Sequence, residues 1–109
     1  MYPNIYLTKY ALKNLKNSKG AIIVISSLSG KFGLPARSAY CASKFALNGF
    51  FEAIRTEEEV PVMMVYPTSL ETPMRSNSLI KTQSQSQEKR EDPKKCASLV
   101  LSSIHKGRE

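Results

Sequence analysis

Two apolar runs separated by a segment of helix length constrain the fold of this 109-residue chain more than any other feature. Residues 21–25 form a continuous apolar, β-branched run, which is typical of a strand buried on both faces of a parallel sheet. Residues 60–66 form a second run, in which Pro61 is tolerable near the start of a strand. The intervening residues 37–57 have helical spacing. Strand, helix and strand of these lengths predict a right-handed crossover with parallel strands.

Two more helices flank this unit. Residues 5–17 predict an amphipathic helix that ends before Gly20, and a last helix has Asp92 as its cap, Pro93 at its first position and Gly107 at its end. The packed faces are expected to hold Thr8, Ala11, Leu12 and Leu15 in the first helix, and Ala39, Ala42, Ala46, Phe50 and Ile54 in the central one. The fold class is α/β: part of a Rossmann-like, doubly wound parallel sheet, in one domain spanning residues 1–109.

The net charge of +7 admits nucleic acid, an anionic membrane or a phosphate-bearing cofactor as the partner. The basic residues are scattered, however, and their one small group reads as the solvent face of the first helix. A phosphate-bearing cofactor is the more economical use of this charge, so no nucleic-acid partner is expected. No run reaches the roughly 18 to 20 apolar residues that cross a bilayer. We expect a cytoplasmic protein, with endoplasmic reticulum association if residues absent from this chain carry an anchor.

The cysteines and the histidine argue against several kinds of site. Cys41 and Cys96 lie in separate predicted helices without metal-ligand spacing, and His105 is the only histidine. A disulfide framework, a zinc centre and a histidine-based triad therefore have little support. No metal site is expected.

Polar segments follow both predicted strands and open the central helix. Ligands of open parallel sheets bind outside the carboxyl ends of the strands, which is where the loop 26–35 and the loop after Tyr66 fall. Tyr40 and Lys44 lie one above the other at the start of the helix. A positive charge favours the ionised form of a phenol, whose usual pKa is roughly 10, and equips it for proton exchange with an alcohol or ketone. An isolated pair at this spacing is more often a half-buried aromatic beside a solvated lysine.

Taken in order, the motifs resemble the short-chain dehydrogenase/reductase family. Tyr40 and Lys44 match the family's Tyr-Lys pair, and Ser27 matches its serine at the end of a hydrophobic strand. Pro67 and Thr72 match the turn after the next strand. The branch that includes 11-beta-hydroxysteroid dehydrogenases and the dehydrogenase/reductase member 7 group is most similar, through the run SSLSGKFGLPARSAYCASKFALNGFFEAIRTE.

This resemblance implies an NAD(P)-dependent oxidoreductase that interconverts an alcohol and a carbonyl on a lipid- or steroid-like substrate. NADP is favoured over NAD by the branch and by the positive charge. Ser27 would donate a hydrogen bond to the substrate oxygen, Tyr40 would exchange the proton, and Lys44 would hold the nicotinamide ribose. Pro67 and Thr72 would border the nicotinamide.

Two further expectations come from the same resemblance. Residues 75–91, rich in Ser, Gln and charge, would be a flexible lid over the substrate. The helix that carries Tyr40 would form a homodimer interface. Taken alone, Ser27, Pro67 and Thr72 would be read as ordinary loop and turn residues.

The chain also departs from the family pattern. It has no glycine-rich turn to meet a pyrophosphate, and Thr68 stands where the family usually has glycine. The family's early helical asparagine falls just before Met1, unless one helical turn is deleted and Asn4 takes its place. The link 57–60 is a few residues shorter than usual. We therefore expect the carboxyl-terminal half of such an enzyme, inactive in isolation; the alternative is a non-catalytic fragment or pseudoenzyme that acts by pairing with a related subunit.

Overall fold

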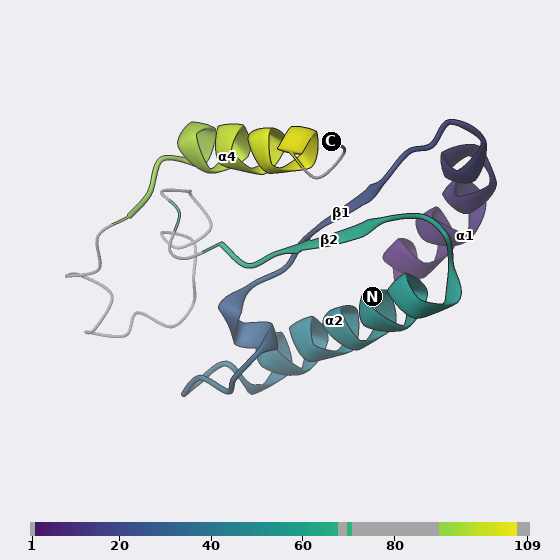
Figure 1. The fold of residues 1–109 in the computed structure, drawn as a ribbon. Coiled ribbons are helices and arrows are strands. Elements are labelled where there is room, and N and C mark those ends of the chain that lie inside the picture. The colour runs from purple at the N-terminus through teal and green to yellow at the C-terminus, as the bar shows by residue number, and fades with distance from the viewer. Residues whose placement is uncertain (1, 68–69, 71–89, 107–109) are drawn as a thin grey trace. The chain divides into compact units, whose positions relative to one another are not determined.

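The computed structural model describes residues 2–67, 70 and 90–106. The described elements are α1 Tyr2–Asn17, β1 Ile22–Ile25, the short 3-10 helix η1 Leu28–Gly30, α2 Ser38–Glu57, β2 Val62–Val65 and α4 Pro93–Lys106 (Figure 1). This helix, strand, helix, strand, helix order confirms the predicted α/β class and agrees with part of a Rossmann fold. The chain divides into two compact units, Met1–Tyr66 and Pro67–Glu109, and each is described by itself.

The two strands pair in parallel, as predicted. Ile22 lies opposite Val62, and the register continues to Ile25 opposite Val65. Backbone hydrogen bonds extend this pairing beyond both strand ends, from Ile22 N to Pro61 O at 2.9 Å and from Ser26 N to Val65 O at 2.8 Å. Pro61 contributes only its carbonyl, so its missing N–H does not interrupt the pairing. Ser26 is thereby held at the carboxyl end of the sheet.

Helix α2 runs along one face of this sheet (Figure 1). The core cluster joins Val24 of β1 to Leu47 and Phe51 of α2, with Ile22, Phe50, Val62 and Met64 packed against it. On the other face, Ile23 is 38% exposed and Ile25 is 55% exposed. The prediction that residues 21–25 are buried on both faces is therefore wrong for this chain. Alternate side chains of a strand point to opposite faces, and only the face of Val24 packs on α2.

The packed face of α2 also differs from the predicted one. Ala39, Ala42 and Ala46 are exposed, whereas Ile54 is buried and Phe50 is half-buried, as predicted. The buried residues of the helix are Cys41, Leu47, Asn48, Phe51 and Ile54. The side of a helix that packs on a sheet is the side whose burial removes the most apolar surface from water. Large side chains remove more apolar surface than alanines do. This rotation brings Asn48 into the interior.

Helix α1 has the predicted stripe on its less exposed side and ends in a Schellman turn. Thr8 is 6% exposed, and the other members of the stripe are half-buried. Gly20 N donates to Leu15 O at 2.8 Å and Lys19 N donates to Lys16 O at 3.2 Å, while Lys19 has the left-handed φ of 52°. The sequence correctly placed the end of this helix before Gly20.

An ion pair joins the end of α1 to the residue that caps α2. The Lys16 ammonium lies 2.6 Å from the Glu58 carboxylate. This hydrogen bond, and then the charge of Glu58, raise the pKa of Lys16 above its ordinary value. The pair ties two segments that each lead into a strand.

In the second unit, the start of α4 agrees with the sequence. Asp92 caps it: its Oδ1 accepts from Lys94 N at 3.0 Å and its carbonyl accepts from Cys96 N at 3.1 Å. Leu70 and Glu91 form an isolated parallel bridge. Of the predicted lid, only its last two residues are described, and Gly107 lies outside the described residues. No helix among the described residues is both long enough and apolar enough to cross a membrane.

Candidate functional site

Ser27 lies in the turn that follows β1. It is the N-cap of η1, with extended backbone (φ −160°, ψ 155°), and its Oγ accepts a hydrogen bond from Ser29 N at 3.2 Å. Ser27 is half-buried, whereas Ser29 is only 2% exposed. Because the N–H of Ser29 uses one lone pair of the Ser27 hydroxyl, the hydroxyl hydrogen stays available to another acceptor. This is the group that a serine needs in order to polarise a carbonyl oxygen.

Tyr40 and Lys44 lie on the first two turns of α2. The Lys44 Nζ atom is 5.8 Å from the centre of the Tyr40 ring, and both residues are half-buried. Within the described part of the chain, neither the phenol nor the ammonium makes a hydrogen bond or ion pair. The two groups are therefore adjacent and available to a ligand. The side-by-side placement expected from their spacing is found in the structure.

Asn48 joins the Ser27 turn to this helix. Ser26 Oγ donates to Asn48 Oδ1 at 2.6 Å, and Asn48 Nδ2 donates to Gly30 O at 2.8 Å. Both side chains are nearly inaccessible, with Ser26 4% and Asn48 6% exposed. Sequence reasoning missed Asn48. The sequence does contain a pattern that points to it, because Asn48 follows Lys44 by four residues, as Lys44 follows Tyr40.

Gly30 permits the close approach of the turn to α2. A Cβ atom on Gly30 would lie 2.5 Å from Asn48 Nδ2 and 3.0 Å from Lys44 O. Since no glycine described in this chain has a positive φ, the requirement here is for space and not for an unusual backbone conformation. The turn that carries Ser27 therefore rests directly on the helix at Lys44 and Asn48.

Lys31 and Tyr66 make a second contact between the loop and the sheet. The Lys31 Nζ atom lies 4.7 Å from the centre of the Tyr66 ring, close enough for a cation–π interaction. The Tyr66 hydroxyl is buried and has no hydrogen-bond partner among the described residues. The sequence predicts Tyr66 at the end of the strand and gives it no role in the site. An unpaired buried hydroxyl at the carboxyl end of β2 is a feature that only the structure reveals.

The structure does not test the other predicted site residues, Pro67 and Thr72. Pro67 is half-buried and is the first residue of the second unit, whereas Thr72 lies outside the described residues. Asn4 lies in the first turn of α1, where its backbone carbonyl accepts from Thr8 Oγ1 at 2.7 Å. Thus Ser27, Tyr40 and Lys44 lie in one unit, around the junction of η1 and α2.

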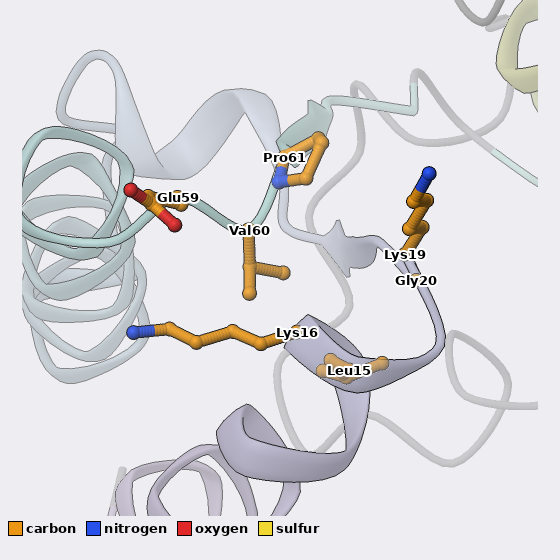
Figure 2. A pocket seen from close by; sticks show the side chains of 7 residues that line it. All are labelled: Leu15, Lys16, Lys19, Gly20, Glu59, Val60 and Pro61. Carbon is orange, nitrogen blue, oxygen red and sulfur yellow. The ribbon is translucent and has the colours of Figure 1, made fainter.

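A cavity of about 320 Å³ lies at the opposite end of the strands (Figure 2). It is bounded by the end of α1 and by the link into β2, with Val60 pointing into the space beside the Lys16 side chain (Figure 2). Its lining residues are Leu15, Lys16, Lys19, Gly20, Glu59, Val60 and Pro61. Because these residues precede the strands and Ser27 follows one, the cavity is separate from the candidate site. Among the described residues, no group of three or more His, Cys, Asp or Glu could hold a metal ion.

Comparison with known proteins places this chain in a family. The model for the short chain dehydrogenase family matches residues 2–83. Hydroxysteroid 11-beta-dehydrogenase 1-like protein A of Xenopus laevis is 53% identical over 53 residues, which cover 49% of this chain and 18% of that protein. Dehydrogenase/reductase SDR family member 7B of Xenopus tropicalis is 40% identical over 79 residues, covering 69% of this chain and 26% of that protein.

A plant relative extends the similarity along nearly the whole chain. The 11-beta-hydroxysteroid dehydrogenase-like protein 3 of Arabidopsis thaliana is 35% identical over 104 residues, covering 94% of this chain and 34% of that protein. The aligned regions thus span between 18% and 34% of the length of these three relatives. The family model, in contrast, matches well over half of the chain. The chain belongs to the short-chain dehydrogenase family.

Proposed function

We propose that this chain carries the proton-transfer half of an NAD(P)-dependent oxidoreductase that interconverts an alcohol and a carbonyl group. One observation carries the proposal: the turn that bears Ser27 rests on α2 at Lys44, which itself lies 5.8 Å from the Tyr40 ring. The proposed hydroxyl donor lies at the start of η1, which packs on α2, and the proposed phenol and ammonium lie on the first two turns of α2. Family membership supports the same reading.

The residues present fit one end of the proposed cofactor. Lys44 makes no described ion pair or hydrogen bond, so its ammonium can hold the hydroxyls of the nicotinamide ribose. The described glycines do not form a turn that could receive a pyrophosphate, so the fit extends to the nicotinamide end alone. When bound, the nicotinamide supplies or accepts the hydride. NADP is the proposed form, on the positive charge of the chain.

The proton is handled by the chain's own residues. In reduction, the Tyr40 hydroxyl donates its proton to the carbonyl oxygen, and in oxidation the phenolate takes it back. Lys44 stabilises the negative charge that builds on the phenol oxygen as the proton leaves. Ser27 donates its hydroxyl hydrogen to the same substrate oxygen, while its own oxygen is held by Ser29 N at 3.2 Å. This last bond orients the Ser27 hydroxyl.

An apolar substrate suits the surface beside this site. Phe32, which is 52% exposed, and Leu34, which is 37% exposed, follow the Ser27 turn in the chain. Relatives reported above are named hydroxysteroid dehydrogenases or similar to them. We infer a lipid- or steroid-like alcohol or ketone as the substrate.

Titration with NADPH, followed by nicotinamide fluorescence, tests the proposal. The wild-type chain should bind saturably, and Lys44→Ala should weaken binding by roughly tenfold or more, since it removes a charge-assisted hydrogen bond. Tyr40→Phe should keep the binding. Because Ser27, Tyr40 and Lys44 are all present in this chain, we propose that it turns over a ketone at a low rate, against the inactivity expected from the sequence, and Tyr40→Phe should abolish that turnover. Lys13→Ala, at an exposed lysine of α1, is the control for a general effect of charge. The absence of binding by the wild-type chain would contradict the proposed function.

The second candidate is a non-catalytic role through pairing with a related subunit. The exposed face of β1, with Ile23 and Ile25, favours it, as does Phe45, which is 46% exposed on α2. The resemblance implies a homodimer through α2, so Phe45 is the residue to test. Sedimentation of wild type and Phe45→Glu should show a dimer only for the wild type. A dimer that does not bind NADPH would favour this second function.

A further inference from the structure

Asn48 is the third member of a stripe that begins with the two proposed catalytic residues of α2. Tyr40, Lys44 and Asn48 are spaced by four residues, so they follow one another along the same side of the helix. Unlike the other two, Asn48 is buried, with only 6% of its surface exposed. A buried carboxamide is costly unless its donor and its acceptor are both satisfied.

Both halves of the Asn48 carboxamide are used, and both bind the turn that carries Ser27. The Asn48 oxygen accepts from Ser26 Oγ at 2.6 Å, and the Asn48 nitrogen donates to Gly30 O at 2.8 Å. Ser26 precedes Ser27 and Gly30 ends η1. The Asn48 side chain therefore binds the turn both before and after Ser27.

The start of the turn is also attached to the sheet, through Ser26 N and Val65 O at 2.8 Å. The sheet alone would fix the point at which the chain leaves β1, but not the direction that the turn takes over α2. The bond to Gly30 fixes this direction, and the missing Cβ of Gly30 allows the close approach. The position of Ser27 relative to the helix thus depends on Asn48.

We propose that Asn48 is a positioning residue that sets the place of the Ser27 hydroxyl relative to Tyr40 and Lys44. The inference rests on the proposed function of those three residues. It explains why this position needs an amide: a leucine of similar size would leave the Ser26 hydroxyl and the Gly30 carbonyl without partners. An aspartate would accept from Ser26 but repel the carbonyl of Gly30.

Amide hydrogen exchange in the cofactor-free chain is the first test. The amides of Gly30 and Lys31 bond within the turn, at 2.9 Å each, whereas the amide of Ser26 bonds within the sheet. Asn48→Ala should speed exchange at Gly30 and Lys31 by roughly tenfold more than at Ser26, because two buried hydrogen bonds are lost. The control Leu47→Ala weakens the core and should speed all three amides alike. Equal changes in the two variants would overturn the proposal.

Asn48→Asp gives a readout that loss of stability alone does not produce. A protonated carboxyl group has one donor and one acceptor, as the amide does, whereas the ionised form has acceptors only. The ratio of exchange at Gly30 to exchange at Ser26 should therefore match wild type in acid and rise as the new carboxyl ionises. The wild-type ratio should stay level across the same pH range. A level ratio in Asn48→Asp would count against the donor role of the amide.

Turnover measurements test whether the hydrogen bonds of Asn48 matter for the reaction. In Asn48→Ala, kcat should fall by roughly tenfold to a hundredfold, in line with loss of an oriented donor to the reacting oxygen. The dissociation constant of NADPH should remain within about twofold of wild type, because Lys44 and not Ser27 holds the ribose. An unchanged kcat would overturn the positioning role. The exchange experiment needs no cofactor, so failure of NADPH binding counts against the proposed function, while the exchange ratio decides whether Asn48 holds the turn.

Discussion

The carbonyl of Gly30 accepts a hydrogen bond from the side-chain amide of Asn48 at 2.8 Å, across a sequence separation of 18 residues. This bond joins the loop after the first strand to the interior of α2. Gly30 ends the turn that carries Ser27, and Lys44 lies one helical turn before Asn48. The alignment of the proposed site therefore depends on a contact that neither segment can form alone.

Gly30→Ala should destabilise the chain, because its Cβ would lie 2.5 Å from Asn48 Nδ2 and 3.0 Å from the backbone oxygen of Lys44. The loss should be about 1 to 3 kcal/mol, the usual cost of overpacking. Gly33→Ala is the matched control, since its Cβ would meet nothing within 4 Å. Urea unfolding followed by circular dichroism measures both variants. Equal stability of the two would show that the turn does not rest on α2.

Ala36→Gly should raise stability, since Ala36 has a left-handed φ of 57°. An L-residue in that conformation costs roughly 1 to 2 kcal/mol, which the larger backbone entropy of glycine partly offsets, so a net gain of about 0.5 to 1 kcal/mol is expected. Ala42→Gly, at an exposed position inside α2, should lower stability by about 1 kcal/mol. Thermal unfolding of the two variants should thus give shifts of opposite sign. A loss in both would refute the backbone conformation at residue 36.

The Lys16–Glu58 ion pair predicts a stability difference at high pH. The folded-state pKa of Lys16 is raised above its ordinary value of 10.5, so the pair contributes fully below that pH and less as pH rises through the folded-state value. The unfolding midpoint of wild type should exceed that of Lys16→Gln near neutral pH, and the two should converge above the raised pKa. Lys13→Gln, at an exposed lysine of the same helix, should show no such convergence. A pH-independent difference for Lys16→Gln would argue against the ion pair.

The two faces of β1 should respond differently to the same substitution. Val24→Thr places a hydroxyl in the core cluster and should cost about 1 to 3 kcal/mol. Ile25→Thr, at a position 55% exposed, should change stability by no more than about 0.5 kcal/mol. Chemical denaturation of both variants provides the comparison. A large loss in Ile25→Thr would indicate that its face is covered, as by a second copy of the chain.

Ser27→Ala should lower turnover of a ketone substrate by roughly a hundredfold to a thousandfold, the usual effect of removing one donor to a developing oxyanion. NADPH binding should persist, because the ribose is assigned to Lys44. Ser18→Ala, at an exposed serine after α1, is the control and should be neutral. Steady-state rates with matched binding titrations separate these effects. Parallel loss of binding and rate in Ser27→Ala would mean that the serine does not act on substrate alone.

The sequence by itself determined the features that depend on neighbouring residues. The end of α1 before Gly20 and the Asp92 cap of α4 were predicted, because caps and helix ends are made from adjacent groups. The pairing of Tyr40 with Lys44 was predicted from one turn of helix, and the parallel strands followed from the length of their connection.

Only the tertiary structure decided which sides of these elements face one another. The alanines of α2 were expected inside, but packing of Leu47 and Phe51 on the sheet turned them outward and brought Asn48 in. The expectation that the β1 face carrying Ile23 is buried was also wrong. A run of apolar residues predicts a strand, but it does not determine whether one or both of its faces will be covered by other elements. The hydrogen bonds of Asn48 span 18 and 22 residues, and no local pattern encodes such partners. They form because the rotation of one helix on its sheet, set by the burial of large apolar side chains, selects the polar group that meets the Ser27 turn.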